Sequence, residues 1–107
     1  MRVNGTDPTG VSDAPKVTFL APAAPNPAAG PTQFRFGLSR SGNADLAVFD
    51  ASGRLVRSVA KGAFTAGQYS LAWDGRDAAG NPAAPGLYFV RLKTNEGVFQ
   101  NRMVLLN

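Results

Sequence analysis

The sequence contains no cysteine and no histidine among its 107 residues. Their absence removes the thiolate and imidazole groups that often act as nucleophiles, general bases and metal ligands. It also removes disulfides, so the hydrophobic core must stabilise the fold alone. Beyond the expected lead-in of residues 1–15, the available carboxylates number five and all lie beside expected turns, which argues against an enzyme. These five are Asp45, Asp50, Asp74, Asp77 and Glu96.

Long apolar runs and basic clusters are also missing. No stretch approaches the roughly 20 apolar residues needed to span a membrane, so we expect no transmembrane segment. The 11 Lys and Arg residues outnumber the 7 Asp and Glu residues, but they are scattered along the chain. We therefore expect no nucleic-acid partner. Residues 1–5 lack the apolar region of a signal peptide, and we interpret this start as a cut within a longer polypeptide.

The clearest strand patterns lie on either side of one polar turn. Residues 68–73 alternate between polar or small side chains and bulky apolar ones, as a strand with one buried face does. Asp-Gly and Gly-Asn pairs within residues 74–81 then predict a tight turn. Alternation resumes in residues 86–92, with Tyr88, Val90 and Leu92 on one face. We expect Trp73, the single tryptophan, to be the largest side chain in the core.

Five further segments carry strand patterns, which makes seven short strands with no helical periodicity. Seven alternating strands joined by turns predict an all-β fold, a seven-stranded antiparallel immunoglobulin-like β-sandwich. A small barrel is the alternative. We expect residues 1–15 to form a linker or mobile lead-in and residues 16–107 to form the sandwich domain. The five segments are residues 16–21, 33–38, 46–50, 55–60 and 98–106.

Connecting segments have distinct compositions. Residues 22–31 are rich in proline, which lacks a backbone donor, so they predict an extended connector that crosses between the sheets. Residues 41–43 predict a turn, and residues 50–53 predict a tight turn that Asp50 caps. The facing of residues 55–60 stays open, because their apolar residues do not share one parity.

Several apolar residues fall on strand positions that should face water. If Leu46 and Val48 face the core, Phe49 faces outward, and Phe89 and Val104 do so by the same rule. The third, sixth and seventh strands of an immunoglobulin-like sandwich share a sheet. Phe49, Phe89 and Val104 are therefore expected to gather in one outer-face patch, which either contacts a partner or is covered by loops or the lead-in. The expected partner is the parent protein's preceding domain or a second copy of the chain.

The last strand is expected to have a polar outer face. Gln100 and Arg102 should face water, which turns Met103 and Leu105 inward. Asn101 then points inward as well. Because a buried amide needs hydrogen-bond partners, we expect Asn101 to bond backbone groups near a sheet edge.

Six short motifs occur in a fixed order along most of the chain. They are Asn26-Pro27, Phe34-x-Phe36-x-Leu38, Leu46-x-Val48-x-Asp50-x-x-Gly53-Arg54-x-Val56, Ala66-Gly67-x-Tyr69-x-Leu71-x-Trp73-Asp74-Gly75-x-Asp77-x-x-Gly80, Gly86-x-Tyr88-Phe89-x-Arg91-Leu92 and Arg102-Met103-Val104-Leu105. In this order the motifs resemble the Ig-like domain of flagellar hook-capping proteins (the FlgD type), and they resemble still more the C-terminal sorting domains of type IX secretion cargo. The resemblance covers about residues 17–106.

This resemblance implies a non-catalytic C-terminal module of a larger exported bacterial protein, secreted or held at the cell surface. The module would act as a sorting or attachment signal read by the secretion machinery of the outer membrane. The resemblance also implies that the signal lies on the last strand. We call this stretch the sorting strand; it comprises Arg102, Met103, Val104, Leu105 and Leu106.

Two other functions fit the sequence. One is a structural adhesion or spacer domain that packs on a neighbouring domain or self-assembles. The other is a carbohydrate-binding module that uses Phe49 and Phe89, although sugar platforms favour Trp and Tyr and we expect Trp73 to be buried.

One loop offers weak candidates for a calcium site. Asp74, Asp77 and Asn81 place three oxygen-bearing side chains close together in the sequence, and calcium binds oxygen ligands. The spacing lacks the terminal Glu of a known calcium loop, and the same residue types cap turns. We therefore expect turn capping and no cofactor.

Overall fold

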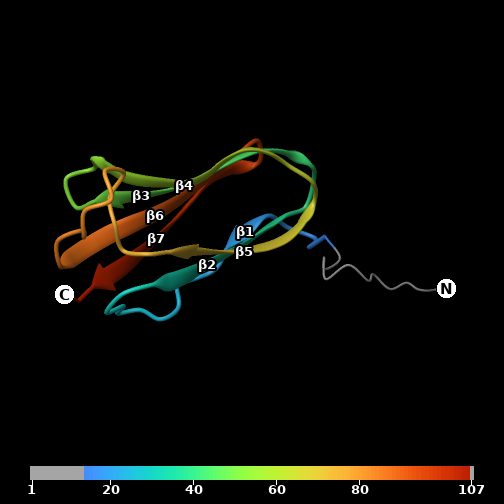
Figure 1. Ribbon diagram of the computed structural model, residues 1–107. Coiled ribbons are helices and arrows are strands. Elements are labelled where there is room, and N and C mark those ends of the chain that lie inside the picture. The colour runs from blue at the N-terminus through green and yellow to red at the C-terminus, as the bar shows by residue number, and fades with distance from the viewer. Residues whose placement is uncertain (1–13, 107) are drawn as a thin grey trace.

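The computed structural model describes residues 14–106, which form seven strands and no helix. The strands make two antiparallel sheets with the orders β1-β2-β5 and β4-β3-β6-β7, packed face to face (Figure 1). This arrangement confirms the predicted all-β immunoglobulin-like sandwich. No helix in this part of the chain is long and apolar enough to cross a membrane. The strands are β1 (Phe19–Leu20), β2 (Thr32–Leu38), β3 (Gly42–Asp50), β4 (Leu55–Phe64), β5 (Gly67–Trp73), β6 (Gly86–Thr94) and β7 (Gly97–Leu105).

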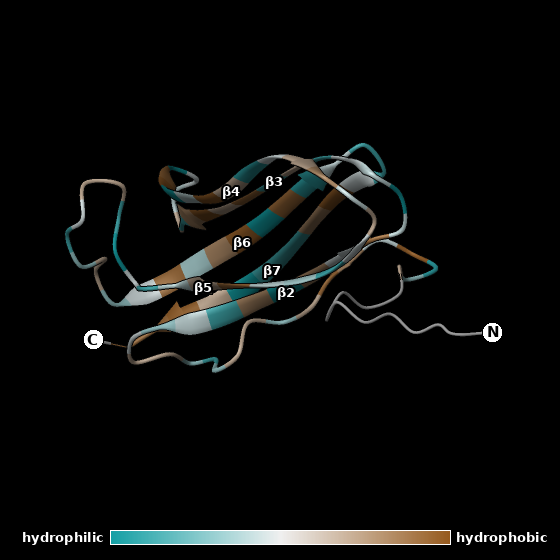
Figure 2. Ribbon diagram, turned by 45° about the vertical axis from the view of Figure 1, so that its right-hand side comes forward, coloured by the Kyte–Doolittle hydropathy of each residue, from teal (hydrophilic) through white to brown (hydrophobic). Residues whose placement is uncertain are grey.

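The core lies between the sheets and is built from alternate positions on each. Along β6, hydrophobic and hydrophilic residues follow one another, and the same mixture recurs on β7 (Figure 2). Trp73 is 1% exposed and leads the fully buried side chains in volume, as predicted. The inward positions of β2 and β6 also follow the prediction. These are Phe34, Phe36, Leu38, Tyr88, Val90 and Leu92.

Three strands differ by more than two residues from their predicted bounds. β4 continues to Phe64, four residues beyond its predicted end. β1 contains only two residues, because it lies between Pro15 and Pro22 and pairs with β2 at Phe36 and Gly37 alone. β3 begins at Gly42, where we predicted a turn. The added residues of β3 pair with β4 from Gly42 and with β6 from Ala44, so hydrogen bonding on both sides extends this central strand.

Irregular pairing between β3 and β4 explains why the facing of residues 55–60 could not be predicted. The register shifts between Leu46 and Ala47 and again between Val48 and Phe49. Each shift inserts an extra residue into β4, which moves the following side chains to the other face. Val56 and Val59 consequently pack against the core, while Leu55 is 58% exposed.

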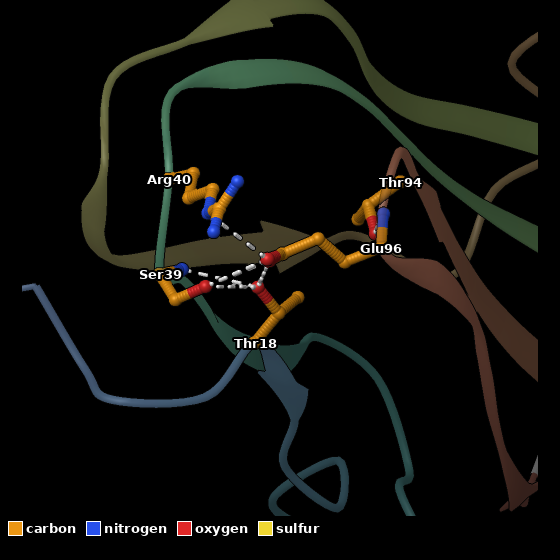
Figure 3. A network of polar contacts seen from close by, with 5 residues as sticks. All are labelled: Thr18, Ser39, Arg40, Thr94 and Glu96. Atoms are coloured by element: carbon orange, nitrogen blue, oxygen red, sulfur yellow. Dashed lines mark hydrogen bonds and ion pairs between the residues drawn. The ribbon is translucent and has the colours of Figure 1, made fainter.

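A polar network ties the N-terminal entry of the domain to the β6–β7 turn. Glu96 in that turn accepts hydrogen bonds from the hydroxyls of Thr18 and Ser39, and the Ser39 N–H donates to Thr18 Oγ1 over 3.0 Å. Arg40 Nε lies 3.8 Å from Glu96 Oε2 (Figure 3). The bonds from Thr18 and then Ser39 lower the pKa of Glu96. The network places the entry of the chain at one end of the four-stranded sheet.

Candidate recognition surface on the C-terminal sheet

The outer-face patch lies on three neighbouring strands of the four-stranded sheet. Phe49 of β3 is directly opposite Phe89 of β6. Phe89 is opposite Arg102 of β7, and Val104 is opposite Leu87 two pairs further along, on the same face. The structure therefore brings Phe49, Phe89 and Val104 together on one face, at the end where β7 finishes.

Two further apolar residues enlarge this surface. Leu55 lies opposite Phe49 on β4, and Leu87 lies opposite Val104 on β7. Leu55 is 58% exposed and Leu87 and Val104 are each 38% exposed, whereas Phe49 and Phe89 are half-buried. We call the outer-face patch together with Leu55 and Leu87 the extended patch. The sequence did not predict that Leu55 belongs to this surface. The two register shifts in the pairing of β3 with β4 make the facing of β4 side chains unreadable from alternation alone.

Basic side chains adjoin the extended patch. The guanidinium carbon of Arg91 lies 4.1 Å from the centre of the Phe49 ring, a cation–π contact that partly covers this ring. Arg102 lies beside Phe89, and Lys93 follows Arg91 along the same face of β6. The face therefore combines apolar and cationic groups.

Replacing Phe89 with serine should lower the free energy of unfolding by no more than about 1 kcal/mol, because its ring lies outside the core and is only half-buried. Urea denaturation followed by tryptophan fluorescence would measure this loss. Phe36→Ser is the matched control, since Phe36 is 0% exposed, and it should cost several times more. A loss of several kcal/mol for Phe89→Ser would instead place this ring in the core.

The sorting strand presents only part of its side chains to solvent. Met103 and Leu105 are core residues with exposures of 0% and 4%. Arg102, Val104 and Leu106 are exposed, and Leu106 lies just beyond the end of β7. Any partner that contacts the folded sorting strand must therefore meet these three side chains.

The proline-rich connector covers the outer edge of β7. The side chain of Asn26 accepts a hydrogen bond from Val104 N–H over 2.9 Å and donates to the Arg102 carbonyl over 3.2 Å. The Ala28 N–H donates to the Val104 carbonyl, and Leu106 N–H donates to the Ala28 carbonyl. The connector thus runs from its bridge with β2 at Ala24 to the edge of β7 and returns to β2. Because β1 and β2 are neighbours in one sheet, the predicted crossing between the sheets is wrong. We call residues 26–28 the edge cover.

Asn101 is half-buried, and its amide bonds backbone groups as predicted. Its Nδ2 donates to the carbonyls of Leu20 and Ala21 over 3.1 and 3.2 Å. These bonds join β7 to β1, which belongs to the other sheet. Asn101 therefore links the two sheets at the edge formed by β1 and β7, which are not paired with each other as strands.

The carboxylates of the β5–β6 loop cap turns. Asp77 Oδ1 accepts hydrogen bonds from Ala79 N–H and Asn81 N–H over 3.0 and 2.9 Å. Asp74 Oδ1 accepts one from Arg76 N–H over 2.9 Å. Across residues 14–106, no three side chains of the types His, Cys, Asp and Glu gather to hold a metal ion. The three calcium candidates therefore share one loop: Asp74, Asp77 and Asn81. The carboxylates of Asp74 and Asp77 already accept hydrogen bonds from backbone N–H groups of this loop.

Adding millimolar calcium should leave the melting temperature unchanged, because Asp74 and Asp77 already accept hydrogen bonds from the loop backbone. Differential scanning fluorimetry with calcium, and with magnesium as the control, measures the effect. A calcium-specific rise that Asp77→Asn abolishes would instead establish a calcium site in this loop.

Asp50 caps the β3–β4 turn as predicted. Its Oδ1 accepts hydrogen bonds from Ser52 Oγ, Ser52 N–H and Arg54 N–H over 2.6, 2.9 and 3.0 Å. The bond from the Ser52 hydroxyl, followed by that from the Arg54 backbone, lowers the pKa of Asp50 from 3.8 to about 2. The charged form is thus favoured in the folded state.

The depressed pKa predicts a loss of stability in acid. The stabilisation by Asp50 is complete above pH 3.8 and is lost as the pH falls towards about 2. Asp50→Asn should therefore lower the melting temperature at pH 6 and reduce its fall between pH 4.5 and pH 2. Thermal denaturation monitored by circular dichroism at several pH values tests this; identical acid profiles for both proteins would contradict it.

Comparisons with known proteins agree with this architecture. The sequence model of the family called FlgD Ig-like domain matches residues 25–97, from the connector to the first residue of β7. No curated protein matches the chain. Among solved structures the chain is similar to dimeric latent PorU from Porphyromonas gingivalis, with a TM-score of 0.65 and 21% identity. That match covers 97% of this chain and 10% of PorU.

Two other solved structures share the fold. FlgD from Xanthomonas campestris, described in terms of hook capping in flagellar assembly, has a TM-score of 0.55 and 28% identity, covering 81% of this chain and 65% of FlgD. PorZ from P. gingivalis, a bacterial surface component of the type IX secretion system, has a TM-score of 0.51 and 19% identity, covering 84% of this chain and 11% of PorZ. Since the matched residues 25–97 make up more than half of its length, the chain belongs to the FlgD Ig-like domain family.

Proposed function

We propose that this domain is a non-catalytic C-terminal module of a larger exported bacterial protein, and that it directs the export or surface attachment of that protein. The observation that carries the proposal is the outward row of Arg102 and Val104 on β7, beside the exposed apolar residues of β6. The fold it shares with PorZ, a surface component of the type IX secretion system, supports a role in export. The module would act outside the cell or at its surface.

Recognition through side chains fits the hydrogen bonding of β7. The edge cover already pairs with the Arg102 carbonyl, with both backbone groups of Val104 and with Leu106 N–H. A partner strand cannot add to this half of β7 without displacing the edge cover. The secretion machinery would therefore read Arg102, Val104 and Leu106 by their side chains.

A structural adhesion or spacer role is the second candidate. The extended patch and the likeness to FlgD, described in the context of hook capping, favour it. A carbohydrate-binding role has less support, because Trp73 and Tyr88 are buried and Tyr69 donates its hydroxyl to the Thr65 carbonyl. None of these three rings offers an open platform for a sugar.

An export assay tests the proposal. The full chain is fused to the C-terminus of a reporter with a signal peptide and produced in a bacterium that has type IX secretion. We expect the reporter in the medium or at the cell surface, and expect it to stay in the periplasm when an unrelated immunoglobulin-like domain replaces this chain. Periplasmic retention of the first fusion, with the domain folded, would contradict the sorting role and leave the spacer role.

A further inference from the structure

We infer that the extended patch and the cations around it form a docking surface for a separate protein that presents apolar side chains flanked by carboxylates. The inference rests on the proposed function and deepens it by stating the chemistry of the partner. Its grounds are the exposure of the patch, the charge of the surrounding face and the position of the patch in the domain.

The apolar part of the surface is continuous across the sheet. One row runs from Leu55 through Phe49 to Phe89, and the next joins Leu87 to Val104. The outer face of an antiparallel sheet that meets water is usually polar. Contiguous apolar residues at such positions mark an interaction site more often than scattered ones do.

The charge of the same face selects the partner. Lys61, Arg91, Lys93 and Arg102 share this face with a single carboxylate, Asp45. The ion pairs found within residues 14–106 involve none of these four cations. These four cations are therefore available to interact with carboxylates on a partner. They would attract such a partner and orient it on this face.

The same charges argue against a second copy of the chain. Two copies that met symmetrically through this face would bring their Arg102 and Arg91 side chains close together. Like charges across an interface oppose association. A partner rich in carboxylates meets no such repulsion.

The position of the patch argues against the preceding domain of the same protein. Leu55 and Phe49 flank the β3–β4 turn, and Val104 lies near the end of β7. The N-terminal entry is held by Glu96 at the opposite end of this sheet (Figure 1). The described chain thus enters the domain at the end away from the patch, which favours a separate protein as the occupant.

A membrane surface suits the patch less well than a protein does. Phe49 and Phe89 are half-buried, and Arg91 lies over the Phe49 ring. Faces that bind membranes insert projecting aromatic and aliphatic side chains into the lipid. Half-buried rings beside exposed aliphatic side chains instead match the complementary surface of a folded protein or peptide.

The test uses two peptides as probes of the isotope-labelled full chain in NMR titrations. One has a Leu-Phe centre flanked by four glutamates, and its matched control has four lysines instead. We expect the acidic peptide alone to shift the amides of the extended patch. Arg102→Glu should weaken this binding at least about fivefold, as the loss of a favourable charge contact does, and Phe89→Ser should weaken it as well. Lys16→Glu is the control, because Lys16 lies beside the N-terminal entry, before β1.

Several results would overturn the inference: no shifts at the patch with the acidic peptide, equal shifts with both peptides, preferential binding to phosphatidylglycerol vesicles, or line broadening at the patch that grows with protein concentration. The export assay separates this failure from failure of the proposed function. If peptide binding fails while the reporter is exported, the docking inference alone falls. If the peptide binds as expected and the reporter is retained, the sorting role falls.

Discussion

Replacing Trp73 with alanine is expected to lower the free energy of unfolding by about 3–5 kcal/mol, the usual cost of removing a large aromatic side chain from a core. Trp73 is 1% exposed and stacks on Phe34 with a distance of 6.4 Å between ring centres. Its ring also meets the edge of Tyr88 at 5.9 Å, which connects β5 of one sheet to β6 of the other. The variant therefore loses contacts on both sides of the sandwich. Since small domains have only about 5–15 kcal/mol of stability, we expect partial unfolding at 37 °C.

Urea denaturation followed by far-UV circular dichroism is the appropriate measurement for Trp73→Ala, because the variant has no tryptophan fluorescence. Trp73→Phe is the matched control. It keeps an aromatic ring and loses the hydrogen bond from Nε1 to the Arg76 carbonyl, which is 2.9 Å long, so it should cost less than alanine. A loss below about 1 kcal/mol for alanine would show that the two sheets do not depend on this ring.

Asn26→Ala is expected to lower the free energy of unfolding by about 1–2 kcal/mol, because it removes two hydrogen bonds to the edge of β7. The amide of Val104 should also exchange with solvent faster, since its acceptor is the Asn26 side chain. An uncovered strand edge invites pairing with another chain. We therefore expect association that grows with protein concentration.

Hydrogen exchange by NMR and sedimentation velocity measure these two effects of Asn26→Ala. Asn26→Asp is the matched control, because it keeps an acceptor for Val104 N–H and loses the donor to the Arg102 carbonyl. The amide proton of Val104 should exchange with solvent more slowly in Asn26→Asp than in Asn26→Ala. Unchanged exchange of Val104 in Asn26→Ala would contradict the role of the edge cover.

Alternation along the chain predicts most of this fold because strands with one buried face have a strict period of two. The inward row from Phe34 to Leu38 and the inward-facing Asn101 both follow from it. Alternation fails on β4, where two register shifts change the parity of side chains within one strand. Such shifts depend on the neighbouring strand, so β4 alone carries no signal for them.

The candidate surface was predictable only in part for a similar reason. Phe49, Phe89 and Val104 have the outward parity, and the strand order places them together. The edge cover was not predictable from period or propensity, because the Asn26 side chain takes the place of a backbone peptide group opposite β7. Asn26-Pro27 is one of the family motifs in the sequence. That motif was the sole sequence feature that pointed to the importance of the edge cover.

The exported fraction of a reporter fused to a Phe89→Ser, Arg102→Glu double variant tests most directly whether this domain works by being recognised through its outer face. Far-UV circular dichroism of the purified double variant verifies that it folds like the wild type. We predict that the folded double variant leaves most of the reporter in the periplasm while the wild-type domain exports it. Export at the wild-type level from the folded double variant would contradict recognition through this surface.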